Sequence, residues 1–127
     1  MSNHDLYAEE AKDRWGNTDS YKESQKRLAN YSKEDIAKAS AQMDDATQEI
    51  KAAFLAGLAA DSSAAMLGAE KHRLAISNWW YECSKQMHQN LGDMYLADPR
   101  FTENYEKLAP GFAQYVRDAI YANASKQ

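Results

Sequence analysis

Apolar residues recur at helical spacing through most of the chain. The clearest stripe advances in steps of three and four: Ile36, Ala39, Met43, Ala46, Ile50 and Phe54. A second stripe fills the last apolar segment: Phe112, Tyr115, Val116, Ala119 and Ile120. No run rich in Val, Ile and Thr suggests a strand. The pattern therefore predicts an all-α fold.

Start and stop signals divide the chain between these stripes. Ser32-Lys33-Glu34-Asp35 resembles a capping box, so a long helix is expected from there. Gly57 marks its end, and Asp61-Ser62-Ser63 marks the start of the next helix. Asp98-Pro99 ends a further helix, because the residue before proline disfavours the helical conformation. A short helix is expected over residues 101–108, with Pro110 in the first turn of the last helix.

The first third of the chain has few large apolar residues. Tyr7, Ala11 and Trp15 share one helical face, and a second short helix carries Tyr21 and Leu28. Such segments bury little area against an ordering cost of about 1–2 kcal/mol per residue. We therefore expect one domain, residues 1–127, in which residues 1–31 form a flexible lid with short mobile helices and residues 32–127 form the stable core.

Composition narrows the setting of the protein. The chain has 127 residues and a net charge of −4, and its 15 Lys and Arg are interleaved with 19 Asp and Glu. No basic stripe results, so direct contact with nucleic acid is not expected. One cysteine excludes an internal disulfide, and no segment approaches the roughly 20 apolar residues of a membrane span. A cytoplasmic protein without cofactor is expected.

The single cysteine, Cys83, lies in the most aromatic stretch, residues 76–95. If that stretch is one helix, Ile76, Trp80, Cys83, Met87, Leu91 and Met94 share a face; a break near residues 79–81 is the alternative. Four roles are open for Cys83: a core residue, a metal ligand, a nucleophile or a contact for a bound ligand. A metal site is disfavoured because three or four suitably spaced ligands are missing. A Cys–His pair with His72 requires the break.

A ligand cleft is the reading that makes most use of the aromatic residues. Aromatic and methionine side chains offer large, adaptable apolar surface to bulky ligands. They crowd around one thiol and also occur in the segment least able to fold alone. A core filled by the same side chains is the alternative, and the pattern does not separate the two.

Three segments resemble a known family when taken in order: RWGNTDSYKESQKR, YSKED and HRLAISNWWYECSKQMHQNLGDMYLADPRFTENYEKLAPGFAQYVRDAI. They are similar to the TipA-S antibiotic-recognition domain, the effector-binding half of a subgroup of MerR-type regulators. The resemblance covers about Tyr7 to Asn123. It implies a globin-like helical domain without haem and a cleft for thiopeptide antibiotics or other bulky, hydrophobic molecules. It also implies an N-terminal part that the ligand orders.

In the thiopeptide-binding relative a cysteine adds to a dehydroalanine of the drug, and Cys83 matches that place. A helix that began near Tyr81 would put Cys83 in its first turn, where the helix dipole favours the thiolate. The DNA-binding domain and coiled coil of the regulators are not in this sequence. We therefore expect either the drug-sensing part of a transcription activator or a free-standing, drug-sequestering protein.

The leading interpretation is antibiotic binding without enzyme activity, with covalent attachment at Cys83 as an option. The expected ligand contacts are Trp79, Trp80, Cys83, Met87, Tyr7, Trp15, His72, Phe101, Tyr105 and Phe112. Because Trp79 and Trp80 are adjacent, they should divide between cleft and core. Two alternatives stay open: a protein interaction or dimerisation module with an aromatic patch, and a cysteine-dependent enzyme.

Overall fold

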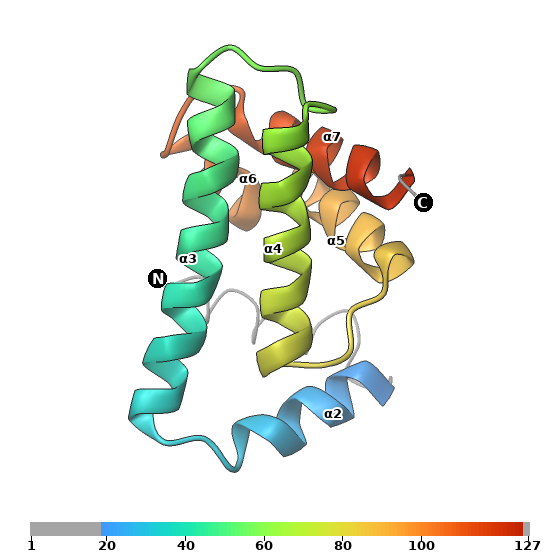
Figure 1. Ribbon diagram of the computed structural model, residues 1–127. Helices are drawn as coiled ribbons and strands as arrows, with labels where there is room; N and C mark the ends of the chain where they lie inside the picture. Colours follow the sequence, from blue (N-terminus) through green and yellow to red (C-terminus); the bar gives the residue numbers. More distant parts are fainter. Residues whose placement is uncertain (1–18, 126–127) are drawn as a thin grey trace.

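A computed structural model describes residues 19–125 of the chain, with side chains from residue 22 on. Within this range the chain is entirely helical, as the pattern predicts (Figure 1). The helices are α2 (Asp19–Leu28), α3 (Lys33–Leu55), α4 (Ser63–Trp79), α5 (Lys85–Ala97), α6 (Pro99–Glu106) and α7 (Phe112–Ser125). The expected helix around Tyr7 and Trp15 lies outside the described residues.

Two long helices form the front of the molecule. α3 and α4 run side by side in opposite directions, and α5, α6 and α7 pack behind them (Figure 1). α2 crosses beneath the end of α4, at the bottom of the view. No helix in residues 19–125 has both the length and the apolar character needed to cross a membrane. The C-terminal end of α4 is therefore where α2 and the linker to α5 come together.

The ends of α3 follow the sequence signals. The Ser32 hydroxyl accepts the Asp35 backbone N–H at 3.1 Å, and the Asp35 carboxylate accepts the Ser32 N–H at 3.1 Å. This reciprocal pair is a capping box, as predicted. At the other end Gly57 has a φ of 78°, and its N–H donates to the Phe54 carbonyl at 3.1 Å. Gly57 thus supplies the left-handed residue that closes the helix.

Close approach of α3 and α4 depends on small residues. A Cβ at Gly68 would lie 2.8 Å from Cγ1 of Ile50 and 3.1 Å from its backbone nitrogen. Alanines fill the rest of this interface and the adjoining core: Ala39, Ala46, Ala53, Ala65, Ala69 and Ala75, all buried. The two helix backbones can therefore pack closely over most of their length.

The start of α7 differs from the prediction. Pro110 lies two residues before the first helical residue, Phe112, and so is not in the first turn. The Glu106 carboxylate accepts the backbone N–H groups of Gly111 at 2.8 Å and Ala113 at 2.9 Å. These bonds lower the pKa of Glu106 and satisfy donors that the helix leaves free. The helix starts where Glu106 caps it, and Pro110 belongs to the preceding turn.

The aromatic stretch is broken into two helices. α4 ends at Trp79, and α5 begins at Lys85 with Ser84 as its N-cap; the Ser84 hydroxyl accepts the Met87 N–H at 3.1 Å. Residues 80–84, here called the α4–α5 linker, are not helical. Trp80, Tyr81 and Cys83 in this linker nevertheless bury their side chains. A single helix through residues 76–95 is therefore excluded. At its far end, α5 stops before Pro99, as predicted.

Candidate functional site

The α4–α5 linker and its flanks gather several of the predicted ligand contacts. Trp80 and Cys83 are buried, at 4% and 1% exposure, while Trp79 and Met87 are half-buried. His72 lies about two turns before Trp79 on α4 and is fully buried. Trp79 and Trp80 thus divide between surface and core, as adjacent residues must. Trp79 and Met87 are the members of this group that already present apolar surface.

Three other predicted contacts form one aromatic cluster with Tyr95. Ring centroids lie 5.1 Å apart for Tyr95 and Phe101, 5.1 Å for Tyr95 and Tyr105, and 5.9 Å for Tyr105 and Phe112. All four side chains are buried where α5, α6 and α7 meet. Their burial makes them core residues in this conformation, and a ligand reaches them only if the core opens. The remaining predicted contacts, Tyr7 and Trp15, lie outside the described residues.

Cys83 is fixed through its backbone. Its N–H donates to the Ser77 hydroxyl at 2.8 Å. Its carbonyl accepts from the Arg73 guanidinium at 2.7 Å and from the Ser77 hydroxyl at 3.3 Å. Two α4 side chains thus hold the linker at the residue that carries the thiol.

The thiol itself is unreactive in this conformation. Burial raises the pKa of Cys83 to about 12, although the Arg73 charge acts in the opposite direction. Cys83 precedes the N-cap Ser84, so it does not occupy the first turn of a helix, and the expected help from the helix dipole is absent. Its sulfur donates a weak hydrogen bond to the Ser84 carbonyl at 3.7 Å. A nucleophilic thiolate would require this linker to move.

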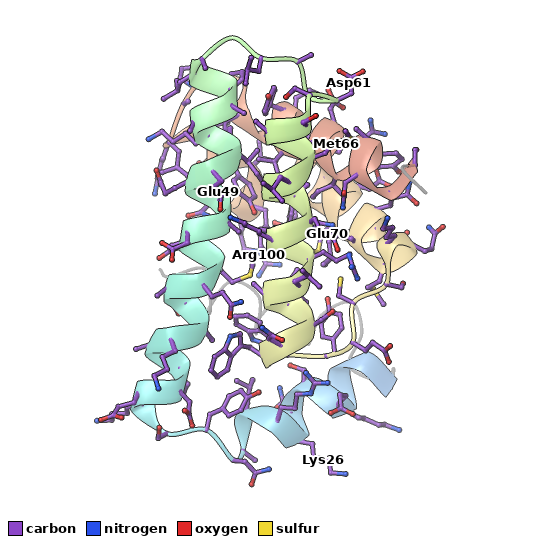
Figure 2. The ribbon with its side chains drawn as sticks, in the orientation of Figure 1. Lys26, Glu49, Asp61, Met66, Glu70 and Arg100 are labelled. Carbon is purple, nitrogen blue, oxygen red and sulfur yellow. The ribbon has the colours of Figure 1, made fainter. Side chains whose placement is uncertain are left out.

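A charged network continues from the linker to the last helix. The Arg73 Nε donates to the Glu70 carboxylate at 2.9 Å, and the Asn123 side chain of α7 donates to the same carboxylate at 2.8 Å. These hydrogen bonds lower the pKa of Glu70, and Glu70 raises that of Arg73. Figure 2 shows Glu70 on the side of α4 that faces α5 and α7. The network therefore anchors the linker to the stable part of the fold.

Two histidines form a buried pair beside the linker. His72 Nδ1 and His88 Nε2 lie 2.9 Å apart, and the rings stack with 5.2 Å between centroids and planes 26° apart. Both are buried, at 0% and 1% exposure. Burial lowers the pKa of His72 to about 4 and lowers that of His88 as well, so both rings are neutral at pH 7. The break after Trp79 lets α5 fold back and bring His88 to His72.

Helix α2 is attached to the same end of α4. The Arg27 guanidinium donates to the Ser77 carbonyl at 2.6 Å, and the Tyr31 hydroxyl donates to the Trp79 carbonyl at 2.8 Å. The Tyr31 ring also meets the Trp79 ring edge-on at 5.5 Å. Tyr31, the last residue of the expected lid, thus packs on the half-buried Trp79, and Arg27 of α2 bonds the same turn of α4.

Several residues of this region were not singled out in the sequence. His88, Arg73, Ser77 and Tyr81 are not among the expected ligand contacts. One signal was available: Ser84 stands three residues before Met87, as an N-cap does. Reading it as a helix start would have predicted the linker and the return of α5 towards α4.

A separate hollow lies between α3 and α4, and none of the α4–α5 linker residues lines it. It measures about 320 Å³ and is lined by Glu49, Ala52, Ala53, Leu58, Ala64 and Leu67. None of these is a predicted ligand contact. Glu49, labelled in Figure 2, forms an ion pair with Lys71 at its edge, 2.6 Å apart. The aromatic linker region therefore remains the candidate site.

Comparison with known proteins shows which family the chain belongs to. The family model of the TipAS antibiotic-recognition domain matches residues 7–123 of the sequence. The chain belongs to the TipAS antibiotic-recognition domain family. A solved structure of TipAS from Streptomyces lividans, in complex with nosiheptide, is similar to this TipAS domain with a TM-score of 0.83 and 46% identity. That match covers 96% of this chain and 85% of the other.

Two further relatives extend the comparison. The transcriptional activator TipA of Streptomyces coelicolor is 47% identical over 120 residues, which are 94% of this TipAS domain and 47% of TipA. The activator mta of Bacillus subtilis is 29% identical, over 90% of this chain and 43% of its own. The chain thus spans about half the length of the curated relatives that it matches. The expected family and its globin-like helical fold are confirmed.

The candidate site of this TipAS domain combines a buried thiol, two hydrogen-bonded histidines and half-buried apolar side chains. Between residues 19 and 125 no group of three or more His, Cys, Asp or Glu is placed to hold a metal ion. The Cys83 thiol donates a hydrogen bond to the Ser84 carbonyl, and the His72 and His88 rings are hydrogen-bonded to each other. A catalytic pair needs the sulfur and an imidazole within hydrogen-bond reach. The arrangement instead provides apolar surface from Trp79 and Met87 beside buried polar groups.

Proposed function

We propose that this TipAS domain binds thiopeptide antibiotics or other bulky hydrophobic antibiotics, and that it acts by binding and not by catalysis. The observation that carries the proposal is the similarity to TipAS bound to nosiheptide, at 46% identity over 96% of the chain. The solved antibiotic binding domain of a TipA-class multidrug resistance regulator supports the same function; it is similar with a TM-score of 0.59 and 48% identity, over 64% of this chain and 86% of the other.

The binding surface would form at the α4–α5 junction. Trp79 and Met87 are half-buried there, and Arg27 and Tyr31 hold α2 against the same place. A bulky apolar ligand that inserts between them would gain about 25 cal/mol for each Å² of apolar surface buried. The residues of the expected lid, 1–31, would close over the ligand in this proposal.

The ligand-binding role would serve either of two larger functions. The curated relatives are transcriptional activators, so one role is the drug-sensing part of a MerR-type activator that also carries a DNA-binding domain. The other is a free-standing protein that sequesters the drug. The alternative is a protein interaction or dimerisation module, whose aromatic patch would have to include the half-buried Trp79, since no aromatic side chain among residues 22–125 is fully exposed.

Covalent capture by Cys83 would follow binding and not precede it. The thiol would add across the double bond of a dehydroalanine: a carbon–sulfur bond forms, the π bond breaks, and the proton ends on the α-carbon. Because burial raises the pKa of Cys83, this step requires the linker to be displaced. Intact mass spectrometry after incubation with nosiheptide would show the adduct.

Thermal unfolding with and without nosiheptide tests the function. A ligand that binds only the folded form at 100 times its Kd stabilises it by about 2.7 kcal/mol. For a domain of this size we expect Tm to rise by roughly 10 °C. Met87→Ala should weaken binding, whereas Leu67→Ala, an exposed leucine at the separate hollow, should not. An unchanged Tm at saturating nosiheptide and with a panel of other thiopeptides would reject the function.

A further inference from the structure

Two buried polar atoms at the α4–α5 junction have no hydrogen-bond partner among the described residues. They are the Tyr81 hydroxyl, on the linker, and His88 Nδ1, in the first turn of α5. The two side chains are only 4% and 1% exposed. A buried polar group without a partner is costly and rare in folded proteins, so each such atom requires an explanation.

The surrounding polar groups show that these two atoms are exceptions. The Cys83 N–H and carbonyl, the Ser77 hydroxyl and the Ser84 hydroxyl all take part in hydrogen bonds. The Tyr31 hydroxyl, on the other side of the junction, also has a partner. These neighbouring groups of the junction are thus hydrogen-bonded, whereas the Tyr81 hydroxyl and His88 Nδ1 are not.

The contact between the histidines indicates which kind of atom His88 Nδ1 is. If His88 Nε2–H donates to His72 Nδ1, then His88 Nδ1 is a bare lone pair. The other tautomer would leave an N–H buried without an acceptor, which is rarer in proteins than an unused acceptor. Burial keeps both rings neutral, so this lone pair is available at pH 7. His88 Nδ1 is thus an acceptor that lacks a donor.

We propose that His88 Nδ1 and the Tyr81 hydroxyl are the polar anchors of the antibiotic site. His88 Nδ1 accepts a hydrogen bond from an amide N–H or hydroxyl of the ligand. The Tyr81 hydroxyl donates a hydrogen bond to a carbonyl oxygen or a ring nitrogen of the ligand. This inference rests on the proposed function and specifies it: the ligand presents amide-like donors and acceptors beside its apolar surface.

The position of the anchors in the chain fits such a site. Tyr81 comes two residues after Trp79, and His88 directly follows Met87; Trp79 and Met87 are the half-buried apolar residues of the junction. The ligand reaches the anchors only when the linker shifts, and the linker is held chiefly by Arg73 and Ser77. Ligand binding would then give both atoms hydrogen-bond partners. The free energy that their unpaired burial costs in the free protein would be recovered in the complex, which strengthens binding.

Isothermal titration with nosiheptide and thermal unfolding of the same variants test the proposal. Tyr81→Phe removes a hydroxyl that has no partner in the free protein, so Tm should stay the same or rise. The Kd for nosiheptide should weaken by roughly two- to tenfold. The matched control is Tyr115→Phe, whose hydroxyl donates to the Leu58 carbonyl at 2.9 Å. That control should lower Tm and leave the Kd unchanged.

His88→Gln is the second variant. A glutamine amide can keep a donor to His72 near the place of Nε2 but has no atom at Nδ1, so the Kd should again weaken by roughly two- to tenfold. Wild-type binding with an unchanged Kd in both variants would overturn the anchors and leave the proposed function standing. A Tm loss in Tyr81→Phe as large as in Tyr115→Phe would also overturn them, because the hydroxyl would then have a partner in the free protein. If the wild type binds neither nosiheptide nor any other thiopeptide of the panel, the function and the anchors are rejected together.

Discussion

Acidification from pH 7 to pH 5 should destabilise the fold through the pair of His72 and His88. Burial lowers the pKa of both rings, so the folded protein takes up protons less readily than the unfolded chain, where the ordinary pKa is 6.5. The unfolded state therefore binds more protons below pH 6.5, and stability must fall as pH falls. The loss from His72 begins near pH 6.5 and is complete below pH 4, where its folded pKa lies.

The size of this effect follows from the two pKa values of His72. A fall from 6.5 to about 4 corresponds to about 3 kcal/mol when the loss is complete. Between pH 7 and pH 5, linkage gives a loss of about 2 kcal/mol from His72 alone. His88 acts in the same direction: burial lowers its pKa most, and the nearby His72 and Arg73 lower it further. Glu70 and Glu106 contribute little in this interval, because hydrogen bonds lower their pKa values below 4.5.

Urea unfolding at pH 7, 6 and 5 measures the effect. With an m-value of about 2 kcal/mol/M, the midpoint should fall by roughly 1 M between pH 7 and pH 5. The double variant His72→Gln/His88→Gln carries no titrating ring at the pair, so its midpoint should change much less over the same interval. An equal midpoint for the wild type at pH 7 and pH 5 would refute the reasoning. It would mean that the folded pair accepts a proton as easily as the unfolded chain.

Two further predictions concern packing and reactivity. Gly68→Ala should destabilise the fold by about 1–3 kcal/mol in urea unfolding, because its Cβ would lie 2.8 Å from Ile50; an unchanged midpoint would show that α3 and α4 separate without cost. Cys83 should react with iodoacetamide at pH 8 far more slowly than free cysteine, because it is 1% exposed and burial raises its pKa to about 12. When the protein is unfolded in urea, Cys83 should react at the rate of free cysteine. Rapid labelling of the native protein would contradict the buried thiol.

Local signals predicted most of the helix boundaries. The capping box at Ser32, the N-cap at Ser62 and the proline at residue 99 each determine a chain conformation within a few residues. Such signals need no knowledge of the rest of the fold. Pro110 misled because a proline is equally suited to a turn, and it was Glu106, five residues before Gly111, that supplied the cap.

The break between α4 and α5 could not be read from periodicity. Trp80 and Cys83 keep helical spacing with Ile76 and Met87, although residues 80–84 are not helical. The linker buries its side chains as a helix would, so the apolar pattern continues unchanged across the break. No glycine or proline marks it.

The polar part of the candidate site was harder still to foresee. His72 and His88 are 16 residues apart and meet only because α5 folds back on α4. Arg73 recognises the Cys83 carbonyl, which is a backbone atom that every residue possesses. Contacts of this kind depend on tertiary geometry, so no characteristic residue spacing in the sequence predicts them. The aromatic and sulfur-containing residues, in contrast, stand out in the sequence itself, and their role as ligand contacts stays a prediction.

The attachment of α2 determines how easily that helix can be released. Arg27 and Tyr31 donate to carbonyls of the last turn of α4, which has no basic residue of its own. Water can replace both donors when α2 leaves, so each hydrogen bond contributes only about 0.5–1.5 kcal/mol. A perturbation of about 1.4 kcal/mol then changes the ratio of docked to released molecules tenfold. Removing one hydroxyl or one guanidinium is enough to shift that population.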